Sequence, residues 1–138
     1  MKKLTTILTL FAMLGVAGCT KAPQATIEGH ITEATDKMLY LDYIGVERTT
    51  VADSMQLDKE GAFRFRVDKP ECFDFYRLRI GKEMAYVSVD STETLTVTAT
   101  LPTLSIGYEV EGSEDNLMLK ALVMKQRELQ AEVQQLAR

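Results

Sequence analysis

The segment from Thr26 to Glu111 consists of short runs in which apolar and polar residues alternate, with turn residues between the runs. In the run Phe63–Val67, for example, apolar residues alternate with arginine. Side chains of an extended chain point alternately to its two faces, so each run has an apolar face to bury and a polar face for solvent. About seven or eight such runs predict a mainly β fold, an antiparallel immunoglobulin-like β-sandwich over residues 26–111.

The turn residues set the expected strand boundaries. Gly61 closes the turn Asp58–Gly61, where a hairpin needs a positive φ that glycine adopts without strain. Pro70 cannot donate a ladder hydrogen bond, so the run before it ends there. The expected strands contain the runs 27–31, 39–43, 49–57, 63–67, 73–80, 84–89, 95–99 and 104–110.

After Gly112 the apolar residues recur with a longer period, and an α-helix is expected over residues 112–138. Ser113 is a suitable N-cap residue, and the two acidic residues after it would lie at the positive end of the helix dipole. The sequence reaches Arg138 without a glycine, asparagine or proline stop. A natural chain that continues past this point and an ordinary frayed terminus therefore both stay open.

Three leucines recur every seven residues along this helix and are the candidate partner-binding residues. They belong to one narrow apolar stripe, which predicts that the helix packs on the sandwich or pairs with a partner. The stripe comprises Met118, Leu122, Leu129, Val133 and Leu136, with Leu122, Leu129 and Leu136 at its centre.

Residues 1–18 have the form of a bacterial secretion signal, with two lysines, an apolar run and small residues up to Gly18. The apolar run is too short and wrongly flanked to span a membrane. Cys19 follows directly, which indicates a lipoprotein: cleavage after Gly18 would leave Cys19 as the first mature residue, with a diacylglycerol on its thiol. Residues 19–25 would form the lipidated cysteine and a polar tether. A plain cleaved signal beside an ordinary cysteine is the alternative.

These features place the chain in the bacterial cell envelope, lipid-anchored to a membrane. Lys21 favours the outer over the inner membrane, because an aspartate at this place retains lipoproteins at the inner membrane in the enterobacterial sorting rule. Removal of residues 1–18 takes away two lysines, which leaves 120 residues and changes the net charge from −4 to −6. An acidic chain is a poor partner for nucleic acid, and its membrane attachment depends on the lipid instead of a basic patch.

Residues of the types that form catalytic and metal sites in other proteins are few and scattered along this sequence. His30 is the only histidine and is expected on the polar side of a strand. Cys72 is the only cysteine besides Cys19, so it has no partner for an internal disulfide, and its acidic neighbours disfavour a reactive thiolate. Asp53-Ser54 lacks the flanking glycines of a nucleophile elbow. We therefore expect no catalytic residue, no cofactor and no metal site.

Two surface patterns are candidates for binding. Arg64, Arg66, Arg77 and Arg79 would form a small basic strip if their strands were neighbours, although long cationic side chains commonly cover a wet sheet face. The threonine-rich strand within Thr92–Thr100 would accept a partner's strand if it lay at a sheet edge, and an interior position would rule this out.

The order of these motifs resembles the β-sandwich domain of unknown function that opens many bacterial envelope lipoproteins of the thioredoxin-like and alkyl-hydroperoxide-reductase-like type. The residues that carry the resemblance are the lipobox Val16-Ala17-Gly18-Cys19, Ile27-x-Gly29-x-Ile31, Leu39-Tyr40-Leu41, Asp53-Ser54, Leu57-Asp58-x-x-Gly61-x-Phe63-x-Phe65, Tyr76-x-Leu78-x-Ile80 and Val110-x-Gly112-Ser113. The resemblance implies a thioredoxin-like domain with a Cys-x-x-Cys motif after the helix. The sequence contains no such motif, so the family's catalytic cysteines have no counterpart in it.

Three functions follow as hypotheses. The first is a lipid-anchored, non-enzymatic module that serves as a spacer, docking or substrate-presenting domain, with a protein partner bound by the C-terminal helix or an edge strand. The second is the N-terminal part of a thiol-disulfide oxidoreductase whose catalytic domain lies beyond Arg138. The third is a small-ligand or glycan carrier that uses the end loops of the sandwich, which the absence of tryptophan disfavours.

Overall fold

A computed structural model describes Gly18 and residues 21–138 of the chain. Residues 1–17 of the expected signal and the expected lipidation at Cys19 lie outside the described residues. Within the described part, no helix is both long enough and apolar enough to cross a bilayer.

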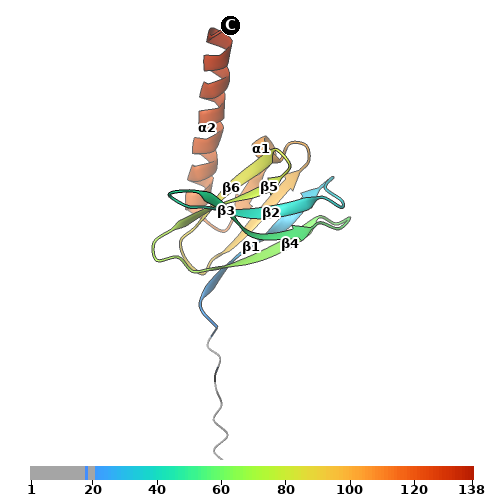
Figure 1. The fold of residues 1–138 in the computed structure, drawn as a ribbon, viewed down its shortest axis with the longest axis vertical. Coiled ribbons are helices and arrows are strands. Elements are labelled where there is room, and N and C mark those ends of the chain that lie inside the picture. Colours follow the sequence, from blue (N-terminus) through green and yellow to red (C-terminus); the bar gives the residue numbers. More distant parts are fainter. Residues whose placement is uncertain (1–17, 19–20) are drawn as a thin grey trace, which may run out of the picture.

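The described chain forms eight strands, one short helix and one long helix (Figure 1). In chain order these are β1 (Gln24–Thr32), β2 (Met38–Ile44), β3 (Thr49–Gln56), β4 (Ala62–Asp68), β5 (Asp74–Ile80), β6 (Glu83–Val89), β7 (Thr94–Thr100), α1 (Leu104–Gly107), β8 (Glu109–Glu111) and α2 (Glu114–Leu136).

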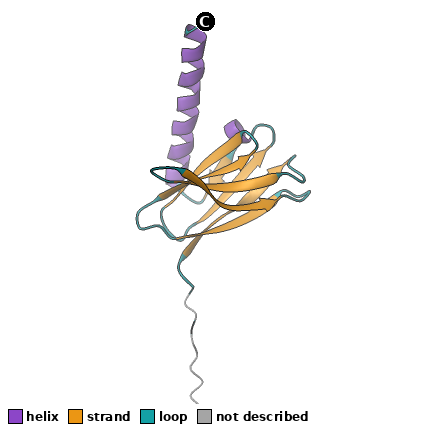
Figure 2. Ribbon diagram, in the orientation of Figure 1, coloured by secondary structure: helices purple, strands orange, loops and turns teal. Residues whose placement is uncertain are grey.

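The strands form two four-stranded sheets that pack face to face, and α2 projects away from them (Figure 2). One sheet has the order β4-β1-β7-β8 and the other has the order β3-β2-β5-β6. All strand pairs are antiparallel except β1 and β7, which run parallel and are separated in the chain by the five strands β2 to β6. The predicted mainly β sandwich with a C-terminal helix is confirmed.

The core lies between the two sheets, and the predicted alternation decides which side chains fill it. Phe63, Phe65 and Val67 of β4 are buried, whereas Arg64 and Arg66 between them are exposed. The two inner faces together bury one continuous apolar cluster. Its largest members with almost no exposed surface are Tyr108, Ile27, Ile31, Leu39, Leu41, Leu57, Leu78, Leu95 and Leu104.

At Gly61 and Gly29, among other positions, a neighbouring backbone comes too close for a side chain. Gly61 has a φ of +67°, as expected for the turn after β3, and its N–H lies 3.0 Å from Oδ1 of Asp58. Gly29, in the middle of β1, has a φ of +154°, and a Cβ there would lie 1.7 Å from the carbonyl oxygen of Val97 on β7. No side chain fits at that point, so Gly29 allows β1 and β7 to pair.

The prediction of a last strand over residues 104–110 is wrong for its first half. Residues 104–107 form α1, which leaves Ile106 63% exposed, and only Glu109–Glu111 form a strand. Pro102 lies before this segment and cannot join a ladder. Ser105 of α1 then holds the helical turn against β6: its N–H donates to Oε2 of Glu83 at 2.8 Å. The hydrogen bonds of Ser105 to β6 stabilise this helical turn, although residues 104–107 alternate like a strand.

Candidate interaction surface

The structure does not bring the potentially reactive residues together. His30 is exposed on β1 in one sheet, and Ser54 is exposed on β3 at the edge of the other sheet. Cys72 is exposed in the loop between β4 and β5 and forms no disulfide within the described part of the chain. Among residues 21–138, no three His, Cys, Asp or Glu side chains are grouped as metal ligands would be.

The predicted basic strip is not formed. Arg64 and Arg66 lie on β4, whereas Arg77 and Arg79 lie on β5 in the opposite sheet. Arg64 instead donates through Nε to Oε2 of Glu28 on the neighbouring β1, at 2.7 Å. Which strands become neighbours depends on the topology of the sandwich, and alternation within each strand carries no information about it.

The threonine-rich strand is also not an edge. It forms β7, which lies between β1 and β8, so an added strand from a partner has no place beside its central residues. Its outer threonines contact a neighbouring strand instead, as shown by the 2.8 Å separation of the Thr32 and Thr100 hydroxyl oxygens. The interior position rules out strand addition at β7. The edge strands of the two sheets are β4, β8, β3 and β6.

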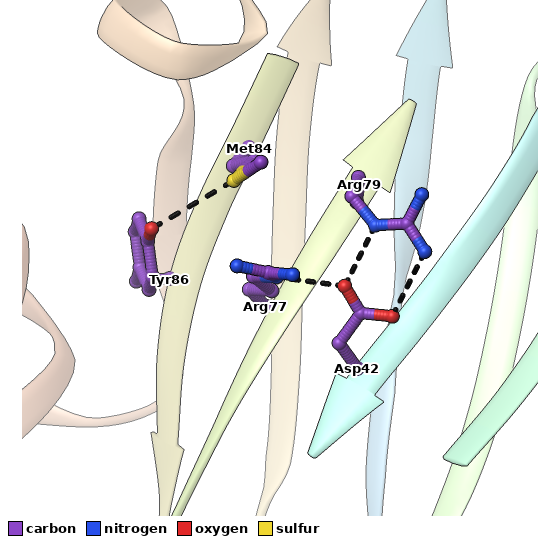
Figure 3. Close-up of polar contacts among 5 residues, drawn as sticks. All are labelled: Asp42, Arg77, Arg79, Met84 and Tyr86. Carbon is purple, nitrogen blue, oxygen red and sulfur yellow. Dashed lines mark hydrogen bonds and ion pairs between the residues drawn. The ribbon is translucent and has the colours of Figure 1, made fainter. Parts of the chain in front are cut away.

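A buried carboxylate organises the outer face of the β3-β2-β5-β6 sheet (Figure 3). Asp42 on β2 is only 1% exposed, although its side chain points away from the core. Arg77 and Arg79 on β5 each donate through Nε to Oδ2 of Asp42 at 2.7 Å, and Nη2 of Arg79 donates to Oδ1 at 3.1 Å. The Arg79 guanidinium also stacks over the ring of Tyr40, 4.5 Å from its centroid.

The charges in this cluster stabilise one another. Burial alone would raise the pKa of Asp42, but the hydrogen bonds and charges of Arg79 and Arg77 outweigh it and lower the pKa of this carboxyl below its usual value. The hydrogen bond to Asp42 in turn raises the pKa of Arg79. The sequence offered one signal for this cluster: an aspartate inside the apolar run of β2, and two arginines spaced two apart on another strand.

The free edge of β6 is covered by polar side chains from α1 and α2. The Met84 N–H donates to Oγ of Ser105 at 2.8 Å. Asn116, fully buried in the first turn of α2, accepts from the Ser88 N–H at 2.7 Å and donates to the Ser88 carbonyl at 2.8 Å. One amide side chain thus takes the place of a neighbouring strand, and it fixes the start of α2 to the sheet. Ser113 occupies the N-cap position as expected, but its side chain makes no capping hydrogen bond.

Only the first four turns of α2 lie against the sandwich. Asn116 is buried and Lys120, Val123 and Arg127 are half-buried, all on one side of the helix. Lys120 also pairs with Glu109 of β8 across 2.9 Å. From residue 128 onward every residue of α2 is exposed, and Figure 1 shows these turns extending beyond the sheets.

A groove of about 660 Å³ lies between α2 and the outer face of the β3-β2-β5-β6 sheet. The sheet contributes Ile44, Phe75 and Tyr86 to its lining, and α2 contributes Leu119, Leu122 and Val123 among others. In Figure 3 Arg77 lies between Asp42 and Tyr86, so the charged cluster borders this groove. The groove and the exposed side of α2 form one continuous surface, which is the candidate interaction surface.

The fold and this surface define a β-sandwich domain with a projecting C-terminal helix. A family model described as a domain of unknown function (DUF4369) matches residues 25–119, and the chain belongs to this family. The matched region covers the sandwich and the first turns of α2. The expected membership of a β-sandwich family of unknown function is thereby confirmed.

Comparisons with other proteins add little to this. No curated protein matches the chain. Among solved structures, the crystal structure of (S)-allantoin synthase is similar with a TM-score of 0.44 and 8% sequence identity. The similarity covers 66% of this chain and spans 44% of that chain.

Proposed function

We propose that the chain is a lipid-anchored, non-enzymatic β-sandwich module of the bacterial cell envelope that docks or presents a protein partner. The observation that carries this proposal is the exposed apolar side of α2. Leu122 is 67% exposed, Leu129 49% and Leu136 88%. Large apolar side chains aligned on one helix face are typical of a protein–protein contact surface, whereas single scattered ones are ordinary.

The geometry of the chain supports a spacer role. In Figure 1 the chain enters β1 from below, and α2 extends above the sheets in the opposite direction. With its 23 residues, α2 spans roughly 35 Å at the usual helical rise. A partner bound to the outer turns of α2 would therefore be held away from the point where the chain enters the sandwich.

The membrane attachment rests on the sequence at the amino terminus. Residues 1–18 have the form of a signal peptide that leads into the lipobox Val16–Cys19, and the acyl chains would anchor the domain because each buried methylene contributes about 0.8 kcal/mol. Lys21 favours the outer membrane as the site of attachment.

Two measurements test the two parts of the proposal. Cells that express the full chain are labelled with radioactive palmitate: the chain should carry label, and Cys19→Ser should abolish it. Label retained in Cys19→Ser, or mass spectrometry showing an unmodified mature terminus, would refute the lipid anchor.

The docking part is tested with Leu122→Asp combined with Leu129→Asp. The double variant should keep the β-sheet circular dichroism of the parent and lose association with its partner. A loss of the β-sheet signal would show that these leucines stabilise the sandwich, and the docking role would then be wrong.

A second candidate function is favoured by the same exposed side of α2. This side of α2 would be covered if the natural chain continued into a thioredoxin-like domain that packs on it. The sandwich would then be the anchoring part of a thiol-disulfide oxidoreductase. Reading the gene past the codon for Arg138 separates the two: a stop codon supports the first proposal, and a downstream Cys-x-x-Cys motif supports the second.

A further inference from the structure

One side of α2 contacts the sandwich, and another side carries the exposed apolar stripe. The side that contacts the sandwich is centred on Asn116, Lys120, Val123 and Arg127, and half-buried Leu119 and Met124 flank it. At about 100° per residue, the leucines at 122, 129 and 136 lie more than a quarter of a turn away from that side. The apolar stripe is therefore free to contact another molecule while α2 remains attached to β6 through Asn116.

The stripe has the spacing of a coiled-coil seam. If Leu122, Leu129 and Leu136 occupy the d positions of successive heptads, the a positions fall three residues before each of them. These a positions hold Leu119, Gln126 and Val133. The seam thus has five apolar residues and one central polar residue.

We propose that this seam pairs α2 with α2 of a second copy of the chain, as a parallel two-stranded coiled coil. The proposal rests on the docking role assigned to the exposed side of α2 and names its partner. It does not depend on the lipid anchor.

The available surface is large enough for such a pair. The exposed fractions are 72% for Met118, 67% for Leu122, 49% for Leu129, 64% for Val133 and 88% for Leu136. With ordinary side-chain areas, these fractions correspond to roughly 600 Å² of surface per copy, including Met118 beside the seam, so two copies would bury at most about 1,200 Å², which reaches the lower bound of a specific interface.

The polar residue in the seam selects the parallel arrangement. In a parallel pair, a positions face a positions, so the two Gln126 side chains meet and hydrogen-bond to each other. In an antiparallel pair Gln126 would face Leu129, and its buried amide would lack a partner. That arrangement would bring Lys125 near Glu132 of the other copy. The free energy gained from an exposed ion pair is smaller than the free energy that an unpaired buried amide costs, so the parallel pair is favoured.

Disulfide cross-linking of the full chain in cells that express it tests the arrangement. In a Cys72→Ser background, Gln126→Cys should form a covalent dimer under mild oxidation, because equivalent a positions are neighbours in a parallel pair. Ala131→Cys is the matched control, since this position lies on the outer side of each helix, and it should stay monomeric. The variant Cys72→Ser without a further cysteine is the control for a cross-link through Cys19.

Two results would overturn the proposal. One is equal cross-linking of Gln126→Cys and Ala131→Cys. The other is a cross-link that appears only when Gln126→Cys is mixed with Leu129→Cys, which would show an antiparallel pair.

The mass of the full chain in mild detergent provides a second measurement. The parent should have twice the protein mass of one copy, Leu129→Asp should have the mass of one, and Ala131→Asp should resemble the parent. A monomeric parent would refute self-pairing but leave the docking of a different partner standing. A dimer that persists in Leu129→Asp would place the interface elsewhere.

Discussion

Replacing Asn116 by alanine should destabilise the domain more than any other polar change in α2. The change leaves both the N–H and the carbonyl of Ser88 without their hydrogen bonds at a buried position. Each unpaired buried group costs about 1–3 kcal/mol, so the free energy of unfolding should fall by about 2–4 kcal/mol. For a domain of this size that loss corresponds to a decrease in Tm of roughly 8–16 °C.

Urea denaturation followed by circular dichroism measures this effect, with Gln134→Ala as the control at an exposed position of the same helix. The control should change the free energy of unfolding by less than about 0.5 kcal/mol. A loss below about 1 kcal/mol in Asn116→Ala would refute the reasoning, because water or a shift of α2 would then satisfy Ser88 equally well.

The variant Asn116→Asp separates the two hydrogen bonds. An ionised carboxylate still accepts from the Ser88 N–H but repels the Ser88 carbonyl, whereas a protonated carboxyl donates to that carbonyl. The pKa of the new carboxyl should therefore be raised in the folded state, and its stabilising effect should be lost as the pH rises through that pKa. The stability gap to the parent should be wide at neutral pH and narrower in acid.

Other predictions concern the rest of the sandwich. Asp42→Asn should lower the free energy of unfolding by about 2–3 kcal/mol near neutral pH. Because the folded-state pKa of Asp42 is lowered, the stabilisation by this carboxylate should fade as the pH falls below about 4. A difference in stability between parent and variant that is independent of pH in urea titrations would contradict this. Gly29→Ala should lower the free energy of unfolding by about 3 kcal/mol or more because its Cβ would clash with Val97. In Gly81→Ala the Cβ meets nothing, so only backbone strain of about 1–2 kcal/mol is expected. Equal losses of stability in thermal unfolding would show that the clash relaxes. Cys72 should react with iodoacetamide without unfolding of the chain, since it is exposed, and labelling that requires denaturant would show that it is covered.

Local patterns were sufficient to predict the strands β1 to β7, but not the last strand. Burial of one side of β4 follows directly from alternation, because period two leaves only one choice of inner face. The turn at Gly61 was also predictable, since its positive φ favours glycine.

The failures all involve contacts between segments that are distant in sequence. Residues 104–107 alternate like a strand but form α1, because Ser105 bonds to Glu83 and Met84 of β6. The burial of Asp42 depends on β5 lying beside β2, and the role of Asn116 depends on β6 being an edge. No pattern within a strand or helix contains that information.

The covering of β6 also bears on aggregation. This strand carries five apolar residues among its seven and only one charge, and at an open edge such a strand readily recruits others like it. The opposite edge of the same sheet is β3, which is richer in polar residues and pairs with β2 through an irregular register that discourages addition. If α2 detached and withdrew Asn116, β6 would become a template for intermolecular β-sheet growth. The helix junction therefore also protects β6 from intermolecular strand addition.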